Sequence, residues 1–108
     1  MRIYRNRGRS VDDFVRSILH EFGHVVDAER LDDPERVAYL ELRGLDPTTE
    51  WSEPGAHRMT DWARQPTEDF AEAMVMIWSD GRWVPRTELL APAPTADVLA
   101  EVELLAAP

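Results

Sequence analysis

The run His20-Glu21-Phe22-Gly23-His24 contains two histidines one helical turn apart, with a glutamate beside the first. On a helix, side chains at positions i and i+4 share one face, with about 5–6 Å between their Cβ atoms. Both imidazoles can therefore reach one tetrahedral zinc ion at about 2.0–2.1 Å. The pattern is typical of hydrolytic zinc sites, although so short a run also occurs in helices that bind no metal.

A catalytic zinc ion needs three protein ligands and one position open to water. The chain has no cysteine, so the third ligand must be a histidine, an aspartate or a glutamate. His57 is the other histidine, but it lies in a connection without helical spacing to the first pair. Glu68 is the stronger candidate, because it opens a predicted helix on which Glu72 follows one turn later and can orient a ligating imidazole. In a metal-free protein, Glu68 would simply be an acid that the helix dipole favours, and Glu72 a solvated acid.

The predicted chemistry is hydrolysis of a peptide bond by water that one bound Zn²⁺ activates. Glu21, next to His20, is the candidate general base that takes the proton from this water and later passes a proton to the leaving amine. The indole N–H of Trp62 is a further candidate, as a donor to the oxyanion, although a tryptophan more often serves packing. Asp27, one turn after His24, is a further candidate for orienting an imidazole, and its simpler interpretation is a surface acid.

The histidine pair belongs to a predicted active-site helix over residues 10–30. Ser10 is a suitable N-cap, and two acids follow in the first turn, where the helix dipole favours them. At 100° per residue the histidines fall almost opposite an apolar stripe, so we expect their face to be turned away from the main apolar contact. Gly23 costs about 1 kcal/mol in a helix interior, which indicates a tight approach by another segment. The stripe consists of Val11, Phe14, Val15, Ile18, Phe22, Val25 and Val26.

The second predicted helix has Asp33 as its cap and Pro34 at its first helical position. It ends near Arg43, because Gly44 is a suitable C-terminal stop. The prolines and polar residues between positions 45 and 66 then predict an ordered connection with little regular structure.

Two predicted helices follow this connection. The third-ligand helix covers residues 67–80, with Thr67 as its cap and with Glu68 and Glu72 on the side opposite its core face. The C-terminal helix covers residues 95–107, with Thr95 as its cap. The core-facing positions are Phe70, Met74, Ile77 and Trp78 in the former helix, and Val98, Leu99, Val102, Leu105 and Ala106 in the latter.

Length and composition predict one mainly α domain over residues 1–108, with one small core and little or no β-sheet. The net charge is −9, and all 12 basic side chains are arginines. Four of these arginines form a basic N-terminal arm, residues 1–9, which is most simply a solvated terminus. The acidic remainder argues against nucleic acid as a partner, because phosphate binding needs a broad basic surface.

No apolar run is long enough to span a membrane, and no apolar segment follows the basic arm as in a signal peptide. We therefore expect a protein that is cytoplasmic as synthesised and has no membrane partner, with non-classical export left open. The sequence also leaves open the substrate, the oligomeric state and membership of a larger protein.

The run Ile18–Asp27 resembles the active-site helix of the anthrax lethal factor-like zinc peptidases, and the run Glu68–Ala73 resembles the third-ligand helix of that family. The resemblance implies a minimal zincin-like metallopeptidase domain of the gluzincin type, acting on a peptide or protein substrate. It also implies roles for single residues: His20, His24 and Glu68 as ligands of one zinc ion, Glu21 as general base and Glu72 as a supporting carboxylate.

The chain departs from the family in two places. Trp62 stands where members tend to carry a tyrosine whose hydroxyl helps to stabilise the transition state, and only nine residues precede Ser10, where zincins usually have an edge strand. The tryptophan leaves open a zinc-binding domain that is catalytically weak or inactive and binds a partner peptide. The acidic surface and the apolar C-terminal stripe leave open a metal-free helical interaction module.

Overall fold

The computed structural model describes residues 11–51, 65–83 and 91–108. Within these ranges the chain forms four α-helices and no strand, which confirms the mainly α prediction. The basic arm 1–9, His57 and Trp62 lie outside the described residues. The helices are α1 (Val11–Arg30), α2 (Asp33–Leu42), α3 (Pro66–Trp78) and α4 (Ala96–Leu105).

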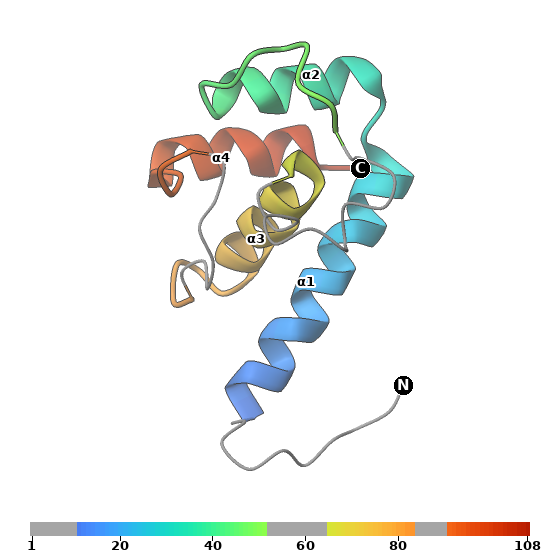
Figure 1. The fold of residues 1–108 in the computed structure, drawn as a ribbon. Coiled ribbons are helices and arrows are strands. Elements are labelled where there is room, and N and C mark those ends of the chain that lie inside the picture. The colour runs from blue at the N-terminus through green and yellow to red at the C-terminus, as the bar shows by residue number, and fades with distance from the viewer. Residues whose placement is uncertain (1–10, 52–64, 84–90) are drawn as a thin grey trace.

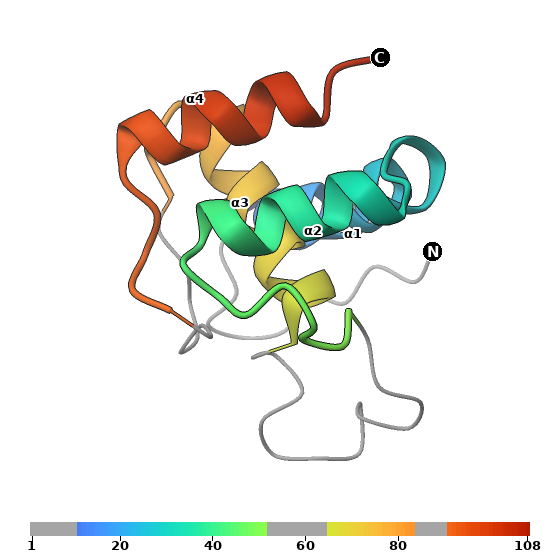
Figure 2. The same cartoon turned by 90° about the horizontal axis from the view of Figure 1, so that it is seen from above.

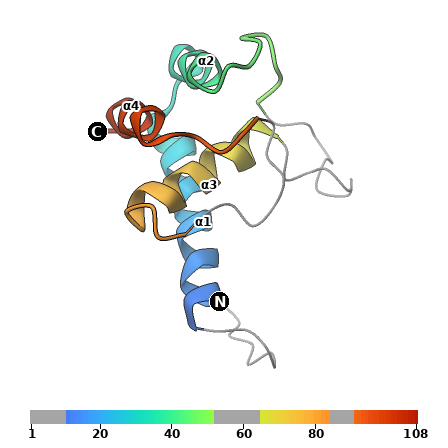
Figure 3. The same cartoon turned by 90° about the vertical axis from the view of Figure 1, so that its left-hand side faces the viewer.

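Helix α3 lies between α1 and α4, and α2 packs beside α4 (Figures 1 and 3). Seen from above, α2 and α4 run side by side over α3 (Figure 2). In Figure 1 the N-terminal half of α1 extends beyond the other three helices. None of the described helices combines the length and the apolar content needed to cross a membrane. Buried side chains from α2, α3, α4 and the end of α1 form the core: Leu31, Tyr39, Phe70, Ala73, Met74, Val102 and Ala106.

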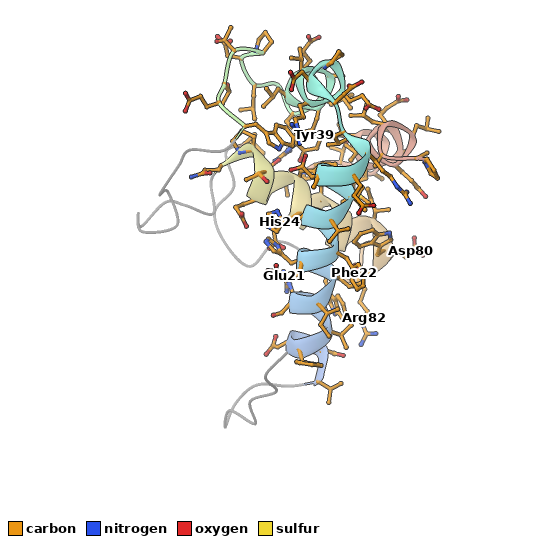
Figure 4. All side chains as sticks on the ribbon, turned by 90° about the vertical axis from the view of Figure 1, so that its right-hand side faces the viewer. Glu21, Phe22, His24, Tyr39, Asp80 and Arg82 are labelled. Carbon is orange, nitrogen blue, oxygen red and sulfur yellow. The ribbon has the colours of Figure 1, made fainter. Side chains whose placement is uncertain are left out.

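The apolar stripe of α1 is only partly covered, since Phe14, Ile18 and Val26 are half-buried and Val26 packs against the core. The prediction that the histidine face is turned away from the main contact is wrong. Val11 is 78% exposed, Phe22 56% and Val25 49%, whereas Gly23 and Asp27 are buried. Figure 4 shows Phe22 on the side of α1 away from Glu21 and His24. The helix instead packs on α3 through its histidine-bearing face, because polar groups on that face find partners on α3 and Gly23 permits a close approach.

Gly23 is where α1 and α3 come closest. A Cβ atom at this position would lie 2.8 Å from the Cα atom of Ala71 and 3.1 Å from its carbonyl oxygen. Such distances leave no space for a side chain, since the neighbouring atoms belong to the backbone of α3. The predicted tight approach at Gly23 is thus confirmed, and its partner is Ala71.

The helix α2 begins one residue before the prediction. Asp32 rather than Asp33 is the N-cap, and it forms a capping box in which the Glu35 amide donates to the Asp32 carboxylate at 3.0 Å and the Asp32 amide donates back at 3.0 Å. The predicted stop at Gly44 is confirmed, since its φ of +72° favours glycine. The capping box is more favourable than Asp33 alone because it satisfies two terminal amides.

The helix α3 begins at Pro66, so Thr67 lies inside the helix and the prediction of Thr67 as its cap is wrong. Gln65 is the N-cap and makes no side-chain capping bond. Because Thr67 is not the cap, its hydroxyl makes contacts outside α3, with Asp27 and His24. Trp78 is 41% exposed, so it is not a core residue as predicted, because it ends the helix beyond the core. The predicted cap of α4 is confirmed, as the Thr95 hydroxyl accepts from the Val98 amide at 3.3 Å.

A buried ion pair joins α2 to α3. The Arg43 guanidinium donates to both carboxylate oxygens of Asp69, at 2.8 and 3.0 Å, and the Tyr39 hydroxyl donates to the same carboxylate at 2.5 Å. Arg43 also donates to the carbonyl oxygens of Pro92 and Ala91, at 2.6 and 3.3 Å. Because Asp69 follows Glu68 directly, this network holds the first turn of α3 against α2 and the segment before α4.

We expect Gly23→Ala to lower the free energy of unfolding by about 1–3 kcal/mol, because the added methyl group meets the backbone of α3. Urea denaturation measures this change. Ala28→Gly, at an exposed position of α1, is the control and should cost about 1 kcal/mol through helix propensity alone. A Gly23→Ala protein that gains about 1 kcal/mol would contradict the close contact.

We expect Arg43→Leu to lower the free energy of unfolding by about 3–5 kcal/mol, because it leaves the Asp69 carboxylate buried without its cation. Arg82→Leu is the matched control, since Arg82 pairs with Asp12 at an exposed position and should contribute at most about 1 kcal/mol. Equal urea midpoints for the two variants would show that the buried pair does not hold α2 on α3.

Candidate metal centre

Three side chains from two helices meet at the contact between α1 and α3. Glu68 Oε1 lies 2.8 Å from His20 Nε2 and 3.1 Å from His24 Nε2, although Glu68 follows His20 by 48 positions. The imidazole rings stand edge to face, with 4.9 Å between centroids. The ligand-type atoms of the three residues all lie within 4.8 Å of one another.

The donor set fits a zinc ion. A tetrahedral zinc ion with bonds of about 2.0–2.1 Å holds its ligand atoms about 3.3 Å apart, so small side-chain shifts suffice to reach that geometry. Two imidazoles and one carboxylate are also a common ligand set of catalytic zinc sites, in which water takes the fourth position. The His24 side chain is 28% exposed, so the cluster can be reached from solvent.

Glu72 lies behind the His20 imidazole, as the sequence predicted for a residue that orients a ligand. Its Oε2 atom is 2.9 Å from His20 Nδ1, and its side chain is 8% exposed. A carboxylate at Nδ1 holds a ring proton on that nitrogen and orients the ring so that Nε2 faces Glu68. Glu72 is therefore not a solvated acid on the outer side of α3, but a buried partner of α1.

Asp27 is buried, which corrects its interpretation as a surface acid. The Arg36 Nε–H donates to Oδ1 at 3.0 Å, and the Trp51 indole N–H donates to Oδ2 at 2.7 Å. The hydroxyl of Thr67 lies 3.1 Å from Asp27 Oδ2 and 3.4 Å from His24 Nδ1, so Asp27 reaches the imidazole only through Thr67.

Sequence reasoning missed Thr67, Arg36 and Trp51 as neighbours of the cluster. Threonine is a preferred N-cap residue, so its place directly before Glu68 led to its assignment as the cap of the helix. Arg36 and Trp51 were missed because no short-range sequence pattern connects them to Asp27. The position of Thr67 directly before the predicted third ligand was the one available signal.

Glu21 is exposed and lies on the same side of α1 as His24 (Figure 4). Trp62 and His57 lie outside the described residues, so their predicted roles have no structural counterpart here.

The cluster also shifts the pKa values of its members. Burial lowers the pKa of His20, but its hydrogen bonds with Glu68 and Glu72 outweigh burial and raise the pKa from 6.5 to about 9. Burial raises the pKa of Glu68, but its bonds with His20 and His24 outweigh burial and lower the pKa from 4.5 to about 2. In the metal-free protein near neutral pH, a cationic His20 therefore lies between two carboxylates, and metal binding must displace its Nε2 proton.

Comparisons of the chain with known protein families, with curated proteins and with solved structures found no match. The candidate site therefore depends on its residues and their geometry. The resemblance of two segments to the lethal factor-like peptidases stays a prediction from the sequence.

Both pKa shifts make the stability of the metal-free protein depend on pH. The raised pKa of His20 gives a contribution that is complete below pH 6.5 and is lost as the pH rises through about 9. The lowered pKa of Glu68 gives a contribution that is complete above pH 4.5 and is lost as the pH falls through about 2. Stabilisation by the cluster is thus greatest between pH 4.5 and 6.5.

Urea unfolding of the parent protein and of Glu68→Gln, both with a chelator present, checks this expectation. The difference between their urea midpoints should be largest between about pH 4.5 and 6.5, and should shrink towards about pH 9. Glu29→Gln, at an exposed position of α1, is the control and should show no such dependence. A difference for Glu68→Gln that stays constant across this range would contradict the ion pairing.

Proposed function

We propose that this protein is a zinc-dependent endopeptidase that binds one Zn²⁺ through His20, His24 and Glu68. The observation that carries the proposal is the convergence of these three side chains, distant in sequence, within 4.8 Å of one another. Support also comes from the motif itself, since the glutamate between the two histidines is exposed and lies on the same side of α1 as His24 (Figure 4).

The outer contacts of the imidazoles support metal binding through Nε2. His20 Nδ1 faces the Glu72 carboxylate at 2.9 Å, and His24 Nδ1 faces the Thr67 hydroxyl at 3.4 Å. An acceptor at Nδ1 holds a ring proton on that nitrogen, so Nε2 is the atom that can bind a metal ion once the proton it shares with Glu68 is displaced. Both Nε2 atoms thus lie on the Glu68 side, where one ion could contact all three ligands.

The reaction is the hydrolysis of a peptide bond in a peptide or protein substrate. A zinc ion held by the three ligands would polarise the scissile carbonyl group and make a water molecule acidic. Glu21 receives the proton of the attacking water on its carboxylate and delivers a proton to the leaving amine. Glu72 keeps the His20 ring oriented throughout. With α1 and α3 supplying these residues, the domain is a minimal zincin-like fold of the lethal factor-like kind.

A second candidate is a helical interaction module. The observation that favours it is the apolar stripe of α1, in which Val11, Phe22 and Val25 are largely exposed. Exposed apolar side chains on one helix face are a common feature of surfaces that bind another protein. A third alternative is a domain that binds zinc but does not hydrolyse peptides. The feature that favours it is Trp62, which stands where members of the family tend to carry a tyrosine.

We expect the parent protein, loaded with zinc at neutral pH, to cleave members of a mixed peptide library, as mass spectrometry of the products will show. Glu21→Gln should reduce the cleavage rate about 10²–10⁴-fold, because the general base is lost. It should keep near-stoichiometric zinc by elemental analysis, because Glu21 is not a ligand. Glu29→Gln is the matched control on an exposed position of α1 and should cleave at the parent rate.

Three other outcomes decide between the candidates. Zinc binding without cleavage by either protein would leave the non-hydrolytic zinc domain. Equal cleavage by the parent and Glu21→Gln would point to a contaminating peptidase. Failure of the parent to retain zinc after loading would reject the metal site and favour the interaction module.

A further inference from the structure

We infer that Thr67 is a positioning residue of the metal centre. Its hydroxyl connects the Asp27 carboxylate to His24 Nδ1 by hydrogen bonds, and this relay determines that His24 binds the metal ion through Nε2. The inference rests on the proposed function, since it concerns the same ligands. It adds a residue that touches neither metal nor substrate. It also makes Asp27 act on His24 through a hydroxyl, in contrast to the direct contact of Glu72 with His20.

The direction of the hydrogen bonds follows from the chemistry of the three groups. An ionised carboxylate can only accept, so the Thr67 hydroxyl donates its proton to Asp27 Oδ2, 3.1 Å away. The lone pairs of the hydroxyl oxygen then remain for His24 Nδ1, 3.4 Å away. A His24 ring that donates from Nδ1 to this oxygen keeps Nε2 for a metal ion. In the metal-free protein this Nε2 lies 3.1 Å from Glu68 Oε1, which can only accept, so a bound ion would replace the proton shared there.

The Asp27 carboxylate is a fixed anchor for this relay. Arg36 of α2 and Trp51, in the segment after α2, both donate to the carboxylate, and the guanidinium of Arg36 lies 5.5 Å from the centre of the Trp51 ring. The backbone amide of Thr67 in turn donates to the carbonyl oxygen of Trp51 at 3.0 Å. The hydroxyl and amide of Thr67 are thus both held, which restricts the rotation of its side chain.

The place of Thr67 in the chain couples the relay to the third ligand. Thr67 and Glu68 are successive residues in the first turn of α3. The Thr67 hydroxyl faces Nδ1 of His24, and the Glu68 carboxylate faces Nε2 of the same ring. The two imidazoles therefore have different supports, a charged carboxylate for His20 and a neutral hydroxyl backed by a carboxylate for His24. Loss of the Thr67 hydroxyl should affect the His24 support and leave the Glu72 contact with His20 in place.

Thr67→Val and Thr67→Ser test this inference, because valine keeps the shape and loses the hydroxyl, while serine keeps the hydroxyl. The dissociation constant for zinc is measured by competition with a chelator, and the visible absorption of the cobalt(II)-loaded protein reports ligand geometry. We expect Thr67→Val to weaken zinc binding about 10–100-fold and to change the cobalt spectrum. Thr67→Ser should restore the parent affinity within a few-fold and restore the parent spectrum.

The controls separate the relay from a general effect on folding. Thr48→Val removes an exposed hydroxyl that donates to Asp46 at 2.6 Å, and it should leave zinc affinity unchanged. Asp27→Asn should weaken zinc binding in the parent but should add no further loss in the Thr67→Val background, because the carboxylate acts through the hydroxyl. Far-ultraviolet circular dichroism and urea midpoints identify any variant whose fold is impaired.

The outcomes distinguish this inference from the proposed function. If the parent binds zinc and Thr67→Val binds it equally well, the relay is rejected and the metal site stands. Equal weakening by valine and serine, or additive losses with Asp27→Asn, would also reject the relay, since the hydroxyl would then not be the acting group. If the parent binds no zinc, the metal site and the relay are both rejected.

Discussion

The close contact between Gly23 of α1 and Ala71 of α3 is the constraint on which the rest of the arrangement depends. It leaves no room for a Cβ atom, so the two backbones meet at one point and one register. In that register Glu68 and Glu72, on either side of Ala71 along α3, both face His20. A shift of α3 by one residue would rotate these carboxylates by about 100° and separate them from the imidazoles.

The interface around this contact is polar, although packed helices usually meet through apolar faces. Glu72 is buried against the His20 imidazole within this interface, and Asp27 and Asp69 are buried beside it, each against an arginine of the α2 segment. Burial of a charge is unfavourable unless it is paired and hydrogen-bonded, so each carboxylate requires its partner to stay in place. The pairing of Glu72 with His20 explains why the histidine face of α1 is inside while Val11, Phe22 and Val25 of its apolar stripe are exposed.

The cluster is supported from both sides by the fold. The Arg43–Asp69 pair fixes the first turn of α3 against α2, and Arg36 with Trp51 fixes Asp27 at the other side of Thr67. Ligand orientation in the proposed zinc site would thus depend on α2, which supplies no ligand. A metal ion would therefore bind with little further loss of conformational entropy, because the side chains that would hold it are already ordered in the metal-free protein.

Local features were accessible from the sequence. The spacing of His20 and His24, the glycine stop at Gly44 and the cap at Thr95 each depend on neighbouring residues, so they could be predicted. The meeting of Glu68 with both histidines was predicted by combining two local motifs with a chemical requirement for a third ligand.

The packing face of α1, the burial of Asp27 and the contacts of the Thr67 hydroxyl were decided by the tertiary structure alone. Hydrophobic periodicity assigns the inner face of a helix from that helix, and it takes no account of partners on another segment. A polar side chain can be buried when a distant segment completes its hydrogen bonds, and only the folded chain brings those partners together.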